Sequence, residues 1–219
     1  MSGLKTNRKI CRTASLNMPV HFKPSGPRKP TLAKAANRVR IIGGTMRSRV
    51  IEFPEVDGLR PTANRVRETL FNWLGQTLSG QRCLDMFSGS GALGFEAASR
   101  GAAEVIMLEV DRNALTTLAT NQKKLGATCC RVVAMDALKF IELGPQKFDI
   151  VFVDPPFGSD LMKAVLTKLP EYLRAGGMVY AEWGVPISEV LANVSCARWE
   201  IAKQGRAGAV HFALLRAPA

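Results

Sequence analysis

Histidine and cysteine are scarce in this 219-residue sequence, and neither forms a metal-binding or disulfide pattern. The two histidines, His21 and His211, lie far apart, and the five cysteines include no CxxC pair. This spacing excludes a typical zinc site and a disulfide framework. We therefore interpret the cysteines as reduced thiols, mostly packed in the core of a cytoplasmic protein. They are Cys11, Cys83, Cys129, Cys130 and Cys196.

Long apolar runs are also absent. No stretch approaches the roughly 20 apolar residues that span a bilayer. The N-terminus has no apolar segment typical of a secretory signal. Its acid-free start resembles a transit peptide, but prolines and glycines interrupt any amphipathic helix there. We expect a cytoplasmic, monomeric protein with no membrane partner and no metal.

Acidic residues are missing from the first 36 positions, whereas eight basic residues occur there, in a chain of net charge +12. A strongly basic chain usually binds a polyanion such as nucleic acid. We predict a basic flexible arm over residues 1–36, which either grips phosphates or is a solvated, disordered tail. Translation could also start at Met18. The basic residues of the arm are Lys5, Arg8, Lys9, Arg12, Lys23, Arg28, Lys29 and Lys34.

Residues 37–80 predict a small N-terminal subdomain. Two strand-like runs flank Gly43-Gly44, a dipeptide that suits a tight hairpin turn. After a loop, Thr62 can cap a helix whose apolar residues recur at helical spacing from Val66 to Leu74. The expected strands are residues 38–42 and 46–53.

From residue 81 to residue 219, short apolar runs alternate with helical patterns. This alternation predicts an α/β fold with a mostly parallel seven-stranded sheet and helices on both faces. The last two strands form a hairpin that adds antiparallel character at one edge. The expected strands are 83–87, 104–110, 130–134, 148–153, 178–182, 199–203 and 209–215. The expected helices are 92–99, 113–125, 137–143, 161–173 and 187–193.

A glycine-rich turn follows the first of these strands. Gly89, Gly91 and Gly94 form GxGxxG between a strand and a helix, directly after Ser88. Such glycines permit a tight turn and a close approach of the backbone to a ligand. Glu109, at the end of the next strand, is placed to bind ribose hydroxyls. The alternative is a tight turn that binds no ligand.

Asp85, at the tip of the strand, bears on which cofactor the turn would bind. NAD enzymes place a glycine directly after the strand and need a pyrophosphate site, which a carboxylate repels. Asp85 suits a ligand with an ammonium or sulfonium group, as in S-adenosylmethionine. Asp136 follows the third strand, where it can accept a hydrogen bond from the adenine amino group, cap the next helix, or do both. Met135 or Ala137 could pack on the adenine ring, although core packing is the default for either.

The sequence Asp154-Pro155-Pro156-Phe157 follows the strongly apolar fourth strand. Ligands bind beyond the carboxyl ends of strands in such sheets, so Asp154 is expected near the sulfonium. The Asp154 carboxylate and the Pro155 carbonyl could accept the two protons of an exocyclic amino group and orient its lone pair. Phe157 could stack on the base. The alternative is a turn with a core phenylalanine.

Taken together, these motifs resemble the RsmD family. The strings RIIGG (40–44), RPT (60–62) and RVRETLFNWL (65–74) carry the resemblance, with the glycine-rich turn and DPPF. Members of this family are Rossmann-like class I methyltransferases that methylate N2 of one guanine in bacterial 16S rRNA. The resemblance covers nearly all of the chain from Arg38 to Leu215.

The resemblance implies a role for each motif. The substrate would be 16S rRNA within the small ribosomal subunit or an assembly intermediate, and the cofactor S-adenosylmethionine. The catalytic residues would be Asp154, Pro155 and Phe157. The cofactor-binding residues would be Arg60, Thr62, Asp85, Ser88, Gly89, Gly91, Glu109, Asp136 and Asp154. The RNA-binding residues would be Arg38, Arg40, Arg47, Arg49, Arg65, Arg67 and Phe157.

Three other functions stay open from the residues alone. DPPF serves adenine-N6 methylation of DNA as well as guanine-N2 methylation of RNA. An RNA-binding protein with an inactive cofactor fold is a second alternative, which the presence of Asp85, Glu109 and Asp154 disfavours. An NAD dehydrogenase is the weakest, because DPPF has no role there and no histidine follows a strand end.

Overall fold

The computed structural model describes residues 37–53, 64–144, 146–156, 158–194 and 199–217. The expected arm, residues 1–36, lies outside the described residues. All of the described residues belong to one compact unit. The boundaries that the sequence suggested at residues 36 and 80 stay predictions.

The first two strands form a small sheet of their own. Strand β1 (Asn37–Arg40) pairs antiparallel with β2 (Val50–Phe53), so that Arg40 lies opposite Val50. The expected tight turn at Gly43-Gly44 is therefore wrong, because nine residues connect the strands. The two glycines serve a close approach instead. Gly44 has φ 73°, and a Cβ atom there would overlap the carbonyl of Ser99 at the end of helix α2 (Ala92–Ser99).

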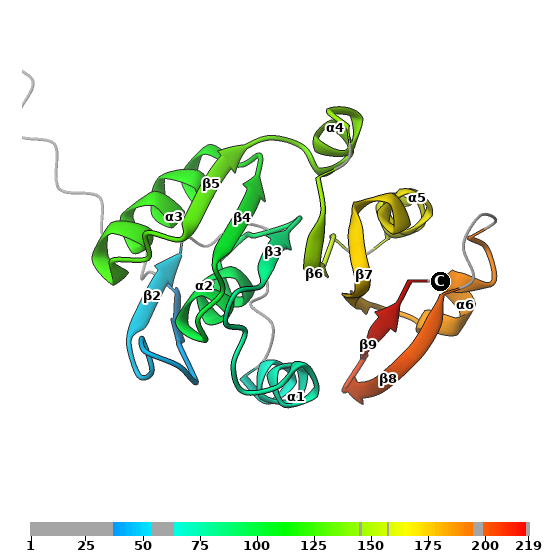
Figure 1. The fold of residues 1–219 in the computed structure, drawn as a ribbon, viewed down its shortest axis with the longest axis horizontal. Helices are drawn as coiled ribbons and strands as arrows, with labels where there is room; N and C mark the ends of the chain where they lie inside the picture. The colour runs from blue at the N-terminus through cyan, green and yellow to red at the C-terminus, as the bar shows by residue number, and fades with distance from the viewer. Residues whose placement is uncertain (1–36, 54–63, 145, 157, 195–198, 218–219) are drawn as a thin grey trace, which may run out of the picture. The chain divides into compact units, whose positions relative to one another are not determined.

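The main sheet has seven strands in the order β5-β4-β3-β6-β7-β9-β8 (Figure 1). Neighbouring strands are parallel except at β9, which is antiparallel to both β7 and β8. The predicted mostly parallel, seven-stranded sheet is confirmed. The strands are β3 (Arg82–Asp85), β4 (Glu104–Glu109), β5 (Cys130–Ala134), β6 (Phe148–Val153), β7 (Leu173–Trp183), β8 (Glu200–Ala207) and β9 (Val210–Arg216).

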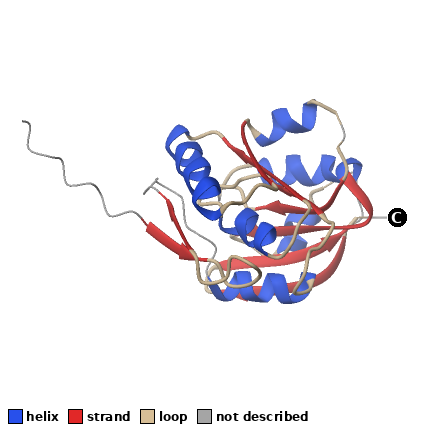
Figure 2. Ribbon diagram, turned by 60° about the vertical axis from the view of Figure 1, so that its left-hand side comes forward, coloured by secondary structure: helices blue, strands red, loops and turns tan. Residues whose placement is uncertain are grey.

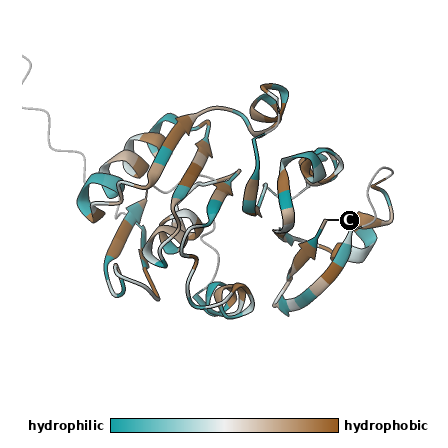
Figure 3. Ribbon diagram, in the orientation of Figure 1, coloured by the Kyte–Doolittle hydropathy of each residue, from teal (hydrophilic) through white to brown (hydrophobic). Residues whose placement is uncertain are grey.

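Helices cover both faces of this sheet (Figure 2). Side chains from α1, α2 and α3 join one buried apolar cluster, and side chains from α4, α5 and α6 join the other. The strands between them carry frequent apolar residues (Figure 3), as strands buried on both sides require. The remaining helices are α1 (Asn64–Leu74), α3 (Arg112–Leu125), α4 (Ala137–Glu142), α5 (Leu161–Lys168) and α6 (Ile187–Leu191).

The helix expected over 161–173 is shorter than predicted. Helix α5 ends at Lys168, a 3-10 turn spans Leu169–Tyr172, and β7 already begins at Leu173. Pro170 lies in the 3-10 turn, where its ring and missing N–H prevent an α-helix from continuing. Met178 pairs with Ile150 after a shift of register, so the glycines at 176 and 177 lie inside an irregular strand rather than at a helix end.

The topology gathers many chain segments at one edge of the sheet. Because β3 to β7 are parallel, their carboxyl ends all lie at the edge where ligands bind in folds of this kind. Strand β9 runs the other way, and His211 pairs with Trp183. The turn between β8 and β9 therefore lies at the same edge as the carboxyl end of β7.

Candidate active site

Asp85 is a buried carboxylate at the carboxyl end of β3, with 3% of its surface exposed. Its Oδ2 accepts a hydrogen bond of 3.1 Å from the Gly94 N–H, in the first turn of α2. Burial raises the pKa of Asp85 to about 7, against the opposing effect of backbone hydrogen bonds. No basic side chain of the described residues forms an ion pair with Asp85. A cationic group of a ligand would therefore be stabilised here.

The turn after β3 depends on its glycines. Gly89 has φ 47° and Gly91 has φ 79°, in the left-handed region that other residues rarely adopt. A Cβ atom at Gly91 would lie 2.6 Å from both the Leu118 side chain and the Phe95 ring. Ser88 closes the turn, because its Oγ donates to the Asp85 carbonyl at 3.1 Å. The backbone is thus held close to the sheet edge.

Glu109 links the carboxyl end of β4 to this turn. Its Oε2 accepts a hydrogen bond of 2.8 Å from Gly89 N–H. Its Oε1 accepts bonds of 2.7 Å from Val110 N–H and 2.8 Å from Asp111 N–H. These three donors fix a half-buried carboxylate beside the glycine-rich turn, as the sequence pattern indicated. Its contact with a ribose stays a prediction.

A cleft of about 620 Å³ lies beyond the ends of β4 and β5, and Val110, Met135 and Asp136 are among its lining residues. The Val110 side chain is 65% exposed, which is unusual for a large apolar residue. Asp136 caps α4, since its Oδ1 accepts from Leu138 N–H at 2.9 Å and Lys139 N–H at 3.1 Å. Helix capping by Asp136 is confirmed, and its contact with adenine stays a prediction.

Asp154 and Pro155 follow β6 at the same edge. Asp85 pairs with Phe152, so Asp154 lies two residues beyond Asp85 on the neighbouring strand. Asp154 is half-buried and Pro155 is buried. The structure thus brings the two predicted motifs together. Phe157, Arg60 and Thr62, which the sequence also suggested, lie outside the described residues.

Two residues of this edge were missed by the sequence reasoning. Val153 pairs with Ala181, which places Glu182 of β7 next to Asp154 in register. Glu182 is buried, and the Tyr180 hydroxyl donates a hydrogen bond of 2.7 Å to its Oε2. Burial, Glu182 and Asp154 together raise the pKa of Tyr180 well above its usual value. The available signal was an acid at the end of a third strand, like Asp85 and Glu109.

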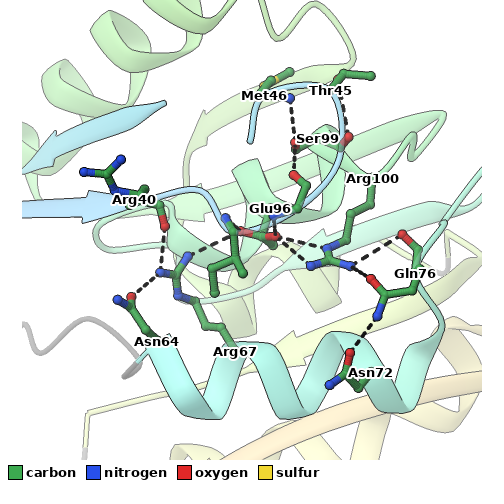
Figure 4. Close-up of polar contacts among 12 residues, drawn as sticks. Arg40, Thr45, Met46, Asn64, Arg67, Asn72, Gln76, Glu96, Ser99 and Arg100 are labelled. Carbon is green, nitrogen blue, oxygen red and sulfur yellow. Dashed lines mark hydrogen bonds and ion pairs between the residues drawn. The ribbon is translucent and has the colours of Figure 1, made fainter. Parts of the chain in front are cut away.

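Arg67 does not lie where the sequence suggested. It was predicted to contact RNA, but its side chain is fully buried. Its guanidinium lies 3.5 Å from Glu96 Oε2 and donates 2.9 Å to the Arg40 carbonyl (Figure 4). Glu96 also pairs with Arg100 at 3.0 Å. A guanidinium with no exposed surface cannot reach a phosphate, so Arg67 is structural.

Glu96 is the centre of this buried cluster. Besides the two arginines, its carboxylate accepts 2.8 Å hydrogen bonds from the N–H groups of Ile42 and Gly43. Burial lowers the pKa of Arg67, and Glu96 opposes that effect. The cluster connects α1, α2 and the β1–β2 connection. The RIIGG and RVRETLFNWL strings therefore meet in a structural contact.

The other arginines predicted to bind RNA are exposed. Arg38 lies 3.4 Å from Glu52, and Arg49 donates to carbonyls at the end of α3. Neither contact removes the side chain from solvent. The exposed arginines of the predicted set are Arg38, Arg40, Arg47, Arg49 and Arg65.

The described residues contain no group of three or more His, Cys, Asp or Glu side chains that could hold a metal ion. Among them, no helix is long and apolar enough to cross a membrane. The described cysteines are free thiols, and burial raises the pKa of Cys83 to about 12. Cys83 is therefore a core residue rather than a nucleophile.

Comparison with known proteins places this chain in a family. Residues 39–216 match the family described as "Conserved hypothetical protein 95". The chain is 42% identical over 173 residues to the ribosomal RNA small subunit methyltransferase D of Escherichia coli K12, covering 77% of this chain and 87% of that protein. The chain belongs to the RsmD family. Another relative of the same name, from Haemophilus influenzae, is 36% identical over 187 residues, covering 82% and 94% of the two chains.

A solved structure supports the same assignment. A proposed methyltransferase of Escherichia coli superposes with a TM-score of 0.73 at 37% identity, over 83% of this chain and 98% of that one. The predicted Rossmann-like class I methyltransferase fold is thereby confirmed, together with the family that RIIGG, RPT and RVRETLFNWL suggested.

Proposed function

We propose that this chain transfers a methyl group from S-adenosylmethionine to the exocyclic N2 of a guanine in 16S rRNA. By family resemblance this is the guanine numbered 966. The observation that carries the proposal is the meeting of Asp85, the glycine-rich turn and Asp154-Pro155 at one sheet edge. The relatives named as small-subunit rRNA methyltransferases supply the substrate class.

The residues around the turn fit the cofactor. The buried Asp85 carboxylate suits the ammonium of the methionine part, and the glycines leave room for a close approach. Glu109 is fixed next to the turn, where it would bind the ribose hydroxyls. The cleft with Val110 and Asp136 would receive the adenine ring. When bound, S-adenosylmethionine supplies an electrophilic methyl group on a positively charged sulfur.

Asp154 and Pro155 would handle the base. An exocyclic amino group conjugated to a ring is a poor nucleophile, because its lone pair is delocalised. The Asp154 carboxylate and the Pro155 carbonyl would accept hydrogen bonds from its two N–H groups and turn the lone pair toward the methyl group. As the nitrogen becomes positively charged, the Asp154 carboxylate stabilises it and takes up a proton. Phe157 would stack on the base.

The exposed arginines would hold the RNA. Arg38, Arg40, Arg47, Arg49 and Arg65 present guanidinium groups to solvent, and phosphate contacts from such groups are largely independent of sequence. The partner would be the small ribosomal subunit or an assembly intermediate, bound by a monomer of this chain. A base within a helix would first have to leave its stack.

The test is methyl transfer to small ribosomal subunits isolated from a strain that lacks this gene. Labelled S-adenosylmethionine serves as the donor, and the nucleosides of the product are then analysed. We expect the label in N2-methylguanosine at one site. Label in N6-methyladenosine, or transfer to duplex DNA alone, would overturn the substrate. Absence of both methyl transfer and S-adenosylhomocysteine binding would favour an RNA-binding protein with an inactive cofactor fold.

A further inference from the structure

A second groove lies between α1 and the β8–β9 hairpin, with a volume of about 430 Å³. Its lining includes Arg65 and Trp73 of α1, and Gly205, Arg206 and Phe212 of the hairpin. Figure 1 shows α1 beside these two strands. The groove therefore combines the helix of the RVRETLFNWL string, which includes Arg65 and Trp73, with a hairpin that none of the motifs behind the proposed function included.

The charge of the groove suits a polyanion. Two arginines line it, and none of its lining residues is acidic. Arg65 and Arg206 are exposed, and neither forms an ion pair with a carboxylate of the described residues. Arg206 Nε donates 2.8 Å to the Gly208 carbonyl, which orients the guanidinium and leaves its two terminal nitrogens available. Guanidinium groups held in this way bind phosphates.

The floor of the groove is aromatic. The rings of Trp73 and Phe212 lie 5.4 Å apart at 30°. A Cβ atom at Gly205 would lie 2.6 Å from the Phe212 ring, so glycine at this position lets β8 pass directly over that ring. Trp73 is only half-buried. A partly exposed ring in a groove lined by two arginines is suited to stacking with unpaired bases, as in single-stranded nucleic-acid sites.

The groove also lies at the same edge of the sheet as the proposed base site. Ala207 pairs with Val210 at the hairpin turn, and Phe212 pairs with Glu182 of β7. Glu182 is next to Asp154 in register. Only β7 therefore separates β9, which carries Phe212, from β6, which ends at the proposed base site. Nucleotides adjoining a base at Asp154 could reach the groove.

We propose that this groove binds the single-stranded RNA that flanks the target guanine, with Arg65 and Arg206 on phosphates and Trp73 under a base. The inference rests on the proposed function, because it assumes an RNA substrate at Asp154. It adds a specific role for the β8–β9 hairpin, which holds the unpaired strand while the target base enters the site.

The test compares Arg206→Glu and Arg65→Glu with Arg131→Glu. Arg131 is an exposed residue of β5, the outermost strand on the side of the sheet away from β8, and its substitution gives the same change of charge. The probe is a labelled single-stranded RNA of about 12 nucleotides with one central guanine, a length within the usual site size. We expect Arg206→Glu and Arg65→Glu each to weaken binding about tenfold. Each should also flatten the slope of log affinity against log salt by the amount that corresponds to about one phosphate contact. Arg131→Glu should stay within about twofold of wild type.

A further variant, Trp73→Leu, separates stacking from charge. It should weaken binding of the same probe about tenfold, at an unchanged salt dependence, because stacking involves no phosphate. Thermal unfolding and S-adenosylhomocysteine binding report whether each variant is folded. For methyl transfer to small subunits, we expect Arg206→Glu to raise KM with little change in kcat.

Three results would overturn the proposal that the groove binds RNA. Arg206→Glu could bind the probe as Arg131→Glu does, or it could keep the wild-type KM. It could also raise KM on assembled subunits without weakening the probe, which would mean that the groove contacts a ribosomal protein. Failure of the proposed function is distinguishable, because wild type would then transfer no methyl group, while the binding comparison would still decide whether RNA occupies the groove.

Discussion

At the residue scale, the site depends on carboxylates in different surroundings. Asp85 is buried and holds the N–H of Gly94, whereas Asp154 is half-buried after β6. Glu109 is tied by three backbone donors. Asp85 is thereby suited to a cationic group of a ligand and Asp154 to accepting hydrogen bonds from an amino group, although all three residues are carboxylates at strand ends.

Asp154→Asn tests the acceptor role. The amide keeps the shape of the side chain but removes the negative charge that stabilises the methylated nitrogen. We expect methyl transfer to fall roughly a hundredfold, as when one preorganised stabilising group is removed. The fold and the affinity for S-adenosylhomocysteine should stay near those of wild type, as calorimetric titration would show. Wild-type turnover in this variant would mean that Asp154 does not bind the amino group.

Asp85→Asn tests the buried carboxylate through its pH dependence. The pKa of Asp85 is raised from its usual value near 4 to about 7, so the folded state holds the proton more tightly than the unfolded state. Wild-type stability is therefore unaffected by this group below about pH 4 and falls as the pH rises toward 7. Asparagine does not titrate. We therefore expect the free energy of unfolding of Asp85→Asn, relative to that of wild type, to be about 2–3 kcal/mol higher at pH 8 than at pH 5.

Urea unfolding of both proteins at the two pH values measures this difference. The comparison cancels the titration of all other groups, because they are common to both chains. The same relative stability at pH 5 and pH 8 would show that Asp85 titrates normally in the folded protein. Binding of S-adenosylhomocysteine should weaken in the variant, since the ammonium loses its counter-charge.

At the element scale, the cluster around Glu96 fixes the N-terminal part of the chain to the sheet. One carboxylate joins Arg67 of α1, Arg100 after α2, and two N–H groups of the β1–β2 connection. Side chains of α1, including Val66 and Leu70, also belong to the apolar cluster of that face. The segment that presents Arg38, Arg40 and Arg65 is therefore packed against the catalytic sheet.

Glu96→Gln should be strongly destabilising. The substitution leaves two buried guanidinium groups without a counter-charge, which typically costs about 3–5 kcal/mol. The matched control is Glu104→Gln, which breaks the more exposed Arg82–Glu104 pair of 2.7 Å. That change should cost about 0–1 kcal/mol. Denaturant unfolding compares the two, and a similar loss in both would contradict the central role of Glu96.

At the scale of the whole molecule, charge and topology combine. The net charge is +12, and eight of the basic residues lie in the first 36 positions. The sheet order β5-β4-β3-β6-β7-β9-β8 places β8 and β9 beside β7, and the antiparallel course of β9 brings the hairpin turn to the carboxyl edge. The exposed Arg206 of this hairpin thereby lies at the same end of the strands as the proposed base site.

Removal of residues 1–36 tests whether the predicted arm grips phosphates. We expect RNA binding to weaken and its salt dependence to flatten, by about 0.7–0.9 in logarithmic slope for each phosphate that the shortened chain no longer neutralises. Cofactor affinity should not change, because every predicted cofactor-binding residue, from Arg60 onward, lies outside the removed segment. Fluorescence anisotropy at several salt concentrations measures the slope. Equal slopes for both chains would identify the segment as a solvated tail.

The sequence by itself determined the alternation of strands and helices, the glycine-rich turn, the acids at strand ends and the family. These features are local, because periodicity, capping by Asp136 and the conformational freedom of Gly91 depend on neighbouring residues. The parallel arrangement then follows from general rules of connection, and it predicts that Asp85 and Asp154 meet at one edge.

Only the tertiary structure decided which arginines are available. Arg65 and Arg67 are two residues apart on one helix, yet Arg65 is exposed and Arg67 is buried against Glu96. Sequence spacing cannot reveal that partner, because it lies 29 residues further along the chain. The same holds for Gly44, which serves the approach of α2 rather than a turn, and for the Trp73–Phe212 floor. Each depends on packing between distant segments, which a local pattern does not encode.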